Sequence, residues 1–160
     1  VIEAADGGRD RVETSVEFAL FDLGANVEDL TLTGSADVRG WGTGGANEIL
    51  GNDGDNRLFG LGGDDTLEGG LGDDTLEGGA GADLFAFRDE FGTDTIVDFG
   101  AGDRLLLDVD GEAEDFDAFL AATTQQGADA VYDLGGDGEN VIVLEDVLVG
   151  DLSADLVDFA

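Results

Sequence analysis

Five nine-residue units follow one another without a gap over residues 42–86, and they constrain the fold more than any other feature of the chain. They read GTGGANEIL, GNDGDNRLF, GLGGDDTLE, GGLGDDTLE and GGAGADLFA. Each unit has Gly at its first and fourth positions, Asp or Asn at its sixth and a large apolar residue at its eighth. A short fixed period of this kind predicts a stack of similar coils, in which each unit packs against its neighbours.

The unit divides into a six-residue turn and a three-residue strand, so that nine residues make half a coil. Residues 18 apart should then stack, with Ile49, Leu67 and Phe85 in one sheet. Leu58 and Leu76 should point inward from the other sheet. One apolar residue per unit makes a thin core, so something besides apolar burial must stabilise the stack.

The overall charge is strongly acidic, with 39 Asp and Glu against six Arg and no Lys, for a net charge of −33. Repulsion on this scale opposes a compact state unless the charge is neutralised or screened. A hydrophobic content of 42% argues against simple disorder, and 160 residues suffice for a single domain. Nucleic-acid binding is excluded, because phosphate contacts need Lys and Arg.

The residue types that most enzymes use for nucleophilic catalysis are missing, because the chain has neither His nor Cys. We therefore expect no enzyme activity. No apolar run is long enough to predict a membrane span. The single Trp41 and Tyr132 are expected to pack in the core or at an edge rather than to stack on sugars.

The flanking segments lack the strict period. Residues 1–41 are expected to form degenerate lead-in rungs, with strands in 12–21 and 27–32. Residues 87–160 are expected to cover the open end of the stack. They contain a short helix at 115–122, capped by Asp115, and a hairpin turn at 135–138. Short strands are predicted at 84–87, 95–99, 104–109, 130–134 and 141–144, and Ser153 is expected to cap a helical turn carrying Leu156 and Phe159.

The turns of the repeats concentrate carboxylates into two columns, formed by Asp55, Asp64, Asp65, Asp73, Asp74 and Asp83. Calcium suits such columns, because it accepts carboxylates and carbonyls in a flexible shell of oxygens. The unit at 69–77 matches the pattern GGxGxDxUx at every specified position; 60–68 has Leu61 for the second Gly, and 78–86 has Phe85 for Leu. The sequence therefore resembles the RTX (repeat-in-toxin) family of calcium-binding repeats. Residues 27–34 resemble an RTX lead-in, and 81–87, 94–99 and 102–105 resemble the post-repeat block of serralysin-type exported proteins.

The resemblance implies an all-β fold, a parallel β-roll with a mostly-β closing segment containing one short helix. It also implies calcium ions held between turns 18 residues apart. One site would use Gly60, Gly62 and Asp64 with Gly79, Gly81 and Asp83. A second would use Gly51, Asp53 and Asp55 with Gly70, Gly72 and Asp74. A third would use Gly42 and Gly44 with Leu61, Gly63 and Asp65, where Ala46 replaces a carboxylate. A half-site of Gly69, Leu71 and Asp73 would be completed by Asp94, Asp98 or Asp103.

The resemblance further implies a secreted, monomeric module that folds on binding extracellular calcium and supports type I secretion of a larger protein. The chain is expected to be a fragment of that protein, with residues 155–160 resembling a C-terminal secretion signal. Two alternatives stay open: an adhesin or surface-layer segment, and a carbohydrate-binding accessory module. The latter would need a basic or aromatic groove, and six scattered Arg disfavour it for an anionic polymer.

Overall fold

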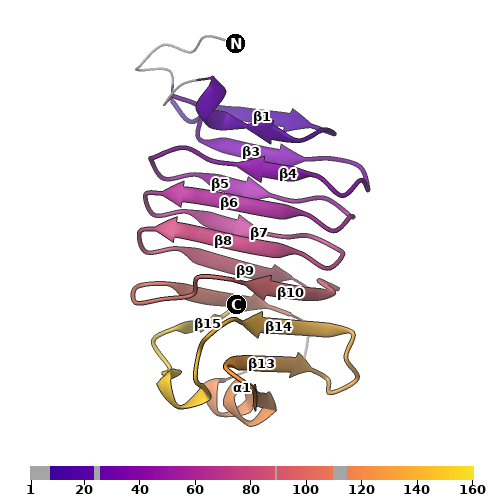
Figure 1. Ribbon diagram of the computed structural model, residues 1–160, viewed down its shortest axis with the longest axis vertical. Helices are drawn as coiled ribbons and strands as arrows, with labels where there is room; N and C mark the ends of the chain where they lie inside the picture. Colours follow the sequence, from indigo (N-terminus) through magenta and orange to yellow (C-terminus); the bar gives the residue numbers. More distant parts are fainter. Residues whose placement is uncertain (1–7, 24–25, 89, 110–114) are drawn as a thin grey trace.

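The chain winds into a stack of coils whose strands alternate between two facing sheets (Figure 1). The computed structural model describes residues 8–23, 26–88, 90–109 and 115–160. The strands pair in parallel within each sheet, except for two antiparallel pairs near the C-terminal end, β12 with β13 and β13 with β14. This arrangement is a parallel β-solenoid, as the nine-residue period predicts.

The first sheet has the order β1-β3-β5-β7-β9-β11-β15. Its strands are β1 (Arg11–Thr14), β3 (Asp29–Leu32), β5 (Glu48–Leu50), β7 (Thr66–Glu68), β9 (Leu84–Arg88), β11 (Arg104–Asp108) and β15 (Val157–Phe159). The second sheet has the order β12-β13-β14-β10-β8-β6-β4-β2. Its strands are β2 (Phe18–Ala19), β4 (Arg39–Trp41), β6 (Arg57–Gly62), β8 (Thr75–Ala80), β10 (Thr93–Ile96), β12 (Thr123–Gln126), β13 (Asp129–Leu134) and β14 (Asn140–Leu144).

The core consists of the inward residues of the two sheets, stacked as the period predicts. Ile49 lies beside Leu67, and Leu67 beside Phe85, on β5, β7 and β9. Leu58 lies beside Leu76 in the second sheet. All five side chains are fully or almost fully buried. Residues 18 apart therefore share an environment, and their apolar burial repeats from coil to coil.

The lead-in continues both sheets, with less regular spacing. Strand β1 pairs with β3, and β2 pairs with β4. The apolar run at 12–21 is not one strand, because it divides into β1, β2 and the 3₁₀ helix Leu20–Asp22. The 3₁₀ helix interrupts the extended backbone and places the side chain of Leu20 in the core, where it is fully buried.

The closing segment adds strands to both sheets and a helix beyond them (Figure 1). Helix α1 (Phe116–Ala122) begins as predicted, with the Asp115 carboxylate accepting from the N–H of Ala118. Its Phe119 packs on Tyr132 with ring centroids 4.7 Å apart. The predicted helical turn at 153–159 is wrong at its end. Val157–Phe159 forms β15, because the free edge of β11 offers backbone partners there.

No helix among the described residues is long and apolar enough to cross a membrane. The division into a lead-in at 1–41, repeats at 42–86 and a closing segment at 87–160 within one domain stays a prediction.

Candidate functional site

Buried side chains at the sixth position of the units line both sides of the stack. In each case, the backbone N–H of one sixth-position residue donates to the side-chain Oδ1 of the corresponding residue in the next coil. Two ladders result, one along Asn47, Asp65, Asp83 and Asp103 and one along Asn56, Asp74 and Asp94, with N···O distances of 2.7–2.9 Å. These bonds hold one carboxylate oxygen of each Asp and fix where the other points.

The second oxygen of four of these aspartates has no partner. Oδ2 of Asp65, Asp74, Asp83 and Asp94 is buried and accepts no hydrogen bond. Burial raises the pKa of Asp65 and of Asp74 to about 7, and that of Asp94 to about 8; it also raises the pKa of Asp83. A buried ionised carboxylate without a counter-charge is costly. The ladders therefore need a cation or a proton.

The first-position glycines leave room around these oxygens. A Cβ atom added at Gly69 would lie 2.1 Å from Oδ2 of Asp74. The same addition at Gly60 would lie 2.4 Å from Oδ2 of Asp65. Any larger residue would displace the carboxylate. The Asp at position six can therefore hold this position only when position one is Gly.

Carboxylates at the fifth position form a second set of contacts, which runs in the opposite direction. Oδ1 of Asp55, Asp64 and Asp73 accepts from the N–H of Asp73, Ala82 and Thr93, respectively, at 2.9–3.0 Å. A fifth-position Asp thus reaches toward the next coil, while the sixth-position Asp of that coil reaches back. Three gaps between turns consequently hold two carboxylates each: Asp55 with Asp74, Asp64 with Asp83, and Asp73 with Asp94.

Carboxylates of neighbouring turns also act on one another electrostatically. After burial, the charge of Asp55 contributes most to the raised pKa of Asp74. The pKa of Asp83 is raised further by the charges of Asp103 and Asp98 and then by that of Asp64. The pKa of Asp94 is raised further by the charge of Asp74 and then by that of Asp73. Like charges held together in this way favour a bound cation.

The turns that carry the predicted ligands stack directly on one another. A Cβ added at Gly79 would lie 2.4 Å from the carbonyl O of Leu61, and one added at Gly81 would lie 2.0 Å from the carbonyl O of Gly63. In the next gap, a Cβ at Gly70 would lie 2.4 Å from the carbonyl O of Asn52. These carbonyls belong to the second and fourth positions of their units. A Cβ added at Gly72 would lie 2.9 Å from the carbonyl O of Gly54 and 3.1 Å from Oδ1 of Asp55, so a carbonyl lies beside a carboxylate there. Carbonyls and carboxylates together are the donor set that calcium prefers.

The described part of the chain contains no group of three or more acidic side chains close enough to hold a metal ion by themselves. This agrees with two carboxylates per gap. Any cation bound there must take its remaining ligands from backbone carbonyls or water.

The half-site at Gly69, Leu71 and Asp73 faces Asp94, one of the three candidates to complete it. Asp98 instead accepts from the N–H groups of Gly78 and Gly79, at 3.0 and 2.8 Å. Asp103 ends the other ladder, where its Oδ2 accepts from Gly100 at 2.8 Å.

The coil pattern continues through residues 92–94, which the strict nine-residue period does not predict. Gly92-Thr93-Asp94 repeats the fourth to sixth positions of Gly72-Asp73-Asp74, but the ladder step there is 20 residues instead of 18. A search allowing a two-residue insertion would have found it. The step from Asp83 to Asp103 is also 20 residues.

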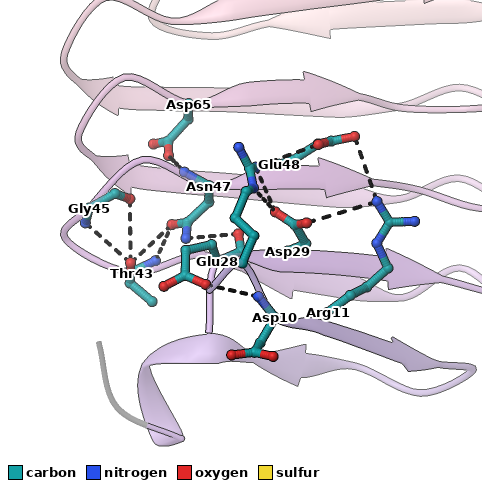
Figure 2. A network of polar contacts seen from close by, with 10 residues as sticks. Asp10, Arg11, Glu28, Asp29, Thr43, Gly45, Asn47, Glu48 and Asp65 are labelled. Atoms are coloured by element: carbon teal, nitrogen blue, oxygen red, sulfur yellow. Dashed lines mark hydrogen bonds and ion pairs between the residues drawn. The ribbon is translucent and has the colours of Figure 1, made fainter. Parts of the chain in front are cut away.

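The N-terminal end of the stack carries neutral or ion-paired groups near the first unit, although Oδ2 of Asp10 is buried there without a partner. Asn47 replaces the acid there, and its Oδ1 accepts from the N–H of Thr43 at 2.6 Å (Figure 2). Nearby, the Arg9 guanidinium lies 2.6 Å from the buried carboxylate of Asp29. Asn56 caps its own turn similarly, accepting from Asn52 at 2.7 Å. The third predicted site therefore has one carboxylate, that of Asp65, because Ala46 and Asn47 supply none.

Comparison with known proteins identifies the repeats. A family model described as the RTX calcium-binding nonapeptide repeat (4 copies) matches residues 41–76 and 60–86. The solution structure of the AlgE6R3 subunit from the Azotobacter vinelandii mannuronan C5-epimerase is similar, with 31% identity and a TM-score of 0.59. The match covers 79% of this chain and 81% of that one. The chain belongs to the RTX family. RTX nonapeptide repeats bind calcium ions.

A second similar structure is that of the extracellular lipase LipA from Serratia marcescens, with 29% identity and a TM-score of 0.50. The match covers 75% of this RTX chain and 21% of the lipase, so the chain spans about a fifth of that protein's length. A search of curated protein sequences finds no significant match.

Proposed function

We propose that this RTX chain is a calcium-binding β-roll module without catalytic activity of its own, and that it folds when calcium neutralises its turns. The observation that carries this proposal is the set of buried, unpartnered Oδ2 atoms on Asp65, Asp74, Asp83 and Asp94. The Oδ2 atoms of Asp65, Asp74 and Asp83 lie beside the first-position glycines of their units, where no protein donor satisfies them.

The strongest candidate calcium sites are the three gaps between turns that hold two carboxylates each. The first combines Asp64 and Asp83 with carbonyls of Gly60, Gly62, Gly79 and Gly81. The second combines Asp55 and Asp74 with Gly51, Asp53, Gly70 and Gly72. The third combines Asp73 and Asp94 with Gly69 and Leu71. The weaker site at Gly42, Gly44, Leu61, Gly63 and Asp65 has one carboxylate.

Bound calcium would supply positive charge and accept the oxygens that the protein leaves without donors. The chain's own residues do the rest: the ladder hydrogen bonds aim the carboxylates, and the glycines keep the space open. Where calcium is scarce, repulsion between paired carboxylates and a thin core favour the unfolded chain. Binding restricted to the folded stack adds its free energy to folding. Extracellular calcium modules bind at about 10⁻⁴–10⁻³ M.

This switch suits a secreted monomer that is part of a larger protein exported by type I secretion. Such a protein must stay unfolded inside the cell and fold outside it. The extracellular lipase among the similar structures supports this setting. The acidic and apolar residues 155–160 remain our candidate for a secretion signal, and an adhesin role remains an alternative.

The proposal is tested by circular dichroism of the purified chain with excess chelator and with calcium at about 1 mM. We expect β structure to appear with calcium. Asp74→Ala should raise the calcium midpoint about tenfold, because a paired, charge-assisted contact is lost. Asp137→Ala, in an exposed hairpin turn, is the matched control and should leave the midpoint unchanged. Superimposed spectra with and without calcium would refute the switch, and equal effects of the two variants would refute the site assignment.

A further inference from the structure

The turn at 51–56 is held together by two of its own side chains. The N–H of Asn52, the second residue of the turn, donates to Oδ1 of Asn56, the sixth residue, at 2.7 Å. The N–H of Gly54 donates to Oδ1 of Asn52 at 2.8 Å, and Nδ2 of Asn56 donates to the same oxygen at 3.0 Å. We call a turn that is closed by its own second and sixth side chains a self-capped turn.

The turn at 42–47 is also self-capped (Figure 2). The N–H of Thr43 donates to Oδ1 of Asn47 at 2.6 Å, and the N–H of Gly45 donates to Oγ1 of Thr43 at 3.1 Å. Nδ2 of Asn47 donates to the carbonyl O of Glu28, in the preceding coil, at 3.0 Å. A self-capped turn therefore supplies its own acceptors and also donates to the coil before it.

The next three turns, at 60–65, 69–74 and 78–83, are built differently. Their second residues have left-handed backbone, with φ of 80° at Leu61, 103° at Gly70 and 99° at Gly79. None of these second residues has a side chain that can form a hydrogen bond. The sixth residue in each turn is an aspartate with a buried, unpartnered Oδ2. These turns therefore leave open the space that a self-capped turn fills with an amide.

The Asn52 amide also fills the gap between its own turn and the turn at 33–38. Nδ2 of Asn52 donates to the carbonyl O of Thr33 at 3.3 Å and to that of Ala36 at 3.1 Å. These two bonds, with the two that its Oδ1 accepts, use every donor and acceptor site of the amide. Asn52 is only 6% exposed, so this complete network is buried.

This gap is equivalent to the gap that holds Asp55 and Asp74. Oδ1 of Asp37 accepts from the N–H of Asp55 at 3.1 Å, just as Oδ1 of Asp55 accepts from the N–H of Asp73 at 3.0 Å. Asp37 is therefore a fifth-position carboxylate, 18 residues before Asp55. The sixth-position partner on the other side of its gap is Asn56, where the equivalent gap has Asp74. The gap thus has one carboxylate and a buried amide network in place of two carboxylates.

We propose that the side chain of Asn52 is a built-in substitute for a calcium ion in the gap between turns 33–38 and 51–56. We further infer that Asp37 marks a latent calcium site, which opens only when the amides of Asn52 and Asn56 are replaced. This inference rests on the proposed function, because it requires that the equivalent gap of Asp55 and Asp74 binds calcium.

The substitution follows from what buried carbonyl oxygens need. A carbonyl in such a gap requires either a hydrogen-bond donor or a cation. The NH₂ group of Asn52 gives donors to two carbonyls, those of Thr33 and Ala36, without adding charge. The carboxylate of Asp37 is exposed, so water solvates it and no second carboxylate repels it. This gap is therefore closed without a cation, and the coils on either side of it stay together when calcium is absent.

The test counts bound ions. The chain is dialysed against calcium at about 10 mM, tenfold above the weak end of the range for extracellular modules, and calcium per chain is measured by atomic emission. Asp37→Asn in the natural chain keeps the acceptor for the N–H of Asp55 and should leave the count unchanged. The double variant Asn52→Gly with Asn56→Asp should bind one ion more than the natural chain. Adding Asp37→Asn to the double variant should remove that extra ion.

Gln126→Glu is the matched control, because it adds the same single charge as Asn56→Asp on an exposed position outside the repeats. It should bind no additional ion. Circular dichroism in calcium verifies that each variant folds. If the double variant does not fold, Asp37→Asn in the natural chain still decides between a gap that holds an amide and a gap that holds an ion.

The inference is overturned if Asp37→Asn lowers the count of the natural chain by one, because the gap would then already bind calcium. A folded double variant without an extra ion would also overturn it, and so would an extra ion that persists after Asp37→Asn or appears with Gln126→Glu. All of these results leave the proposed function standing. A natural chain that binds no calcium would instead refute the proposed function and this inference with it.

Discussion

The sixth-position aspartates combine a satisfied oxygen with an unsatisfied one. Oδ1 of Asp74 accepts from the N–H of Asn56 at 2.7 Å, while its Oδ2 is buried without a partner. Asn56 at the equivalent position is neutral and caps its own turn. The comparison shows what the carboxylate adds, because an amide stabilises the turn by itself whereas the acid requires a positive charge. Position six thus decides whether a coil depends on a cation.

Without calcium, these aspartates predict a stability that falls as the pH rises. Unfolded carboxyls titrate near pH 4, whereas the folded pKa values are about 7 for Asp65 and Asp74 and about 8 for Asp94. Between those limits the folded chain holds more protons than the unfolded chain, so the free energy of unfolding decreases with rising pH. We expect the β content in chelator, measured by circular dichroism, to be higher at pH 5 than at pH 8. Saturating calcium should remove this difference, because bound cations displace the protons. A β content in chelator that increases from pH 5 to pH 8 would contradict the prediction.

Each nine-residue unit consists of a turn that buries a side chain at position six, followed by a strand that buries one apolar residue. The two halves depend on each other, since the turn's ladder bonds set the register in which Leu58 stacks on Leu76. Gly69 is a close-packed point in this arrangement, because its missing side chain leaves the space that Oδ2 of Asp74 occupies.

Gly69→Ala is expected to destabilise the stack by about 1–3 kcal/mol, the usual cost of inserting a methyl group into a packed site. Gly44→Ala is the matched control, because a Cβ there would meet no atom within 4 Å. The free energy of unfolding of both variants can be measured by urea denaturation in saturating calcium. Comparable losses for the two substitutions would show that the backbone conformation of the turn glycines, not the space beside Asp74, sets the effect.

For the whole molecule, the two ends of the stack differ in how their charge is balanced. Near the N-terminus, Asn47 is neutral (Figure 2) and Asp29 is paired with Arg9, although Oδ2 of Asp10 is buried there without a partner. Within the repeats and just beyond them, four buried carboxylates from Asp65 to Asp94 each have an oxygen without a protein partner. The carboxylates that need a cation are therefore concentrated from Asp65 to Asp94.

Hydrogen exchange should reveal this difference between the two parts of the stack. On chelation, amides of β7–β9 are expected to lose more protection than those of β3 and β4, because the carboxylates beside them become unpaired. Mass spectrometry of peptic fragments, with and without calcium, measures the difference. A uniform loss along the chain would mean that the stack unfolds as one unit and that its ends do not differ.

Much of the repeat architecture was predictable from the sequence. The nine-residue period placed Ile49, Leu67 and Phe85 in one sheet and Leu58 and Leu76 in the other, because each unit's environment comes from its near neighbours. Asp115 and the following apolar pattern likewise predicted α1, since a capped amphipathic helix is encoded locally.

Contacts between coils that are not 18 residues apart could be found only in the tertiary structure. Asp94 faces Asp73 only because two extra residues are absorbed between coils, and β15 forms only because β11 has a free edge. The arginines are scattered along the sequence, yet parallel pairing brings Arg39 and Arg57 side by side. By itself, then, the sequence determined the repeating coil, the cation chemistry of its turns and the inward residues, because these repeat over short distances. The tertiary structure decided how the ends close and which outward side chains meet, because sheet register joins residues that no local pattern links.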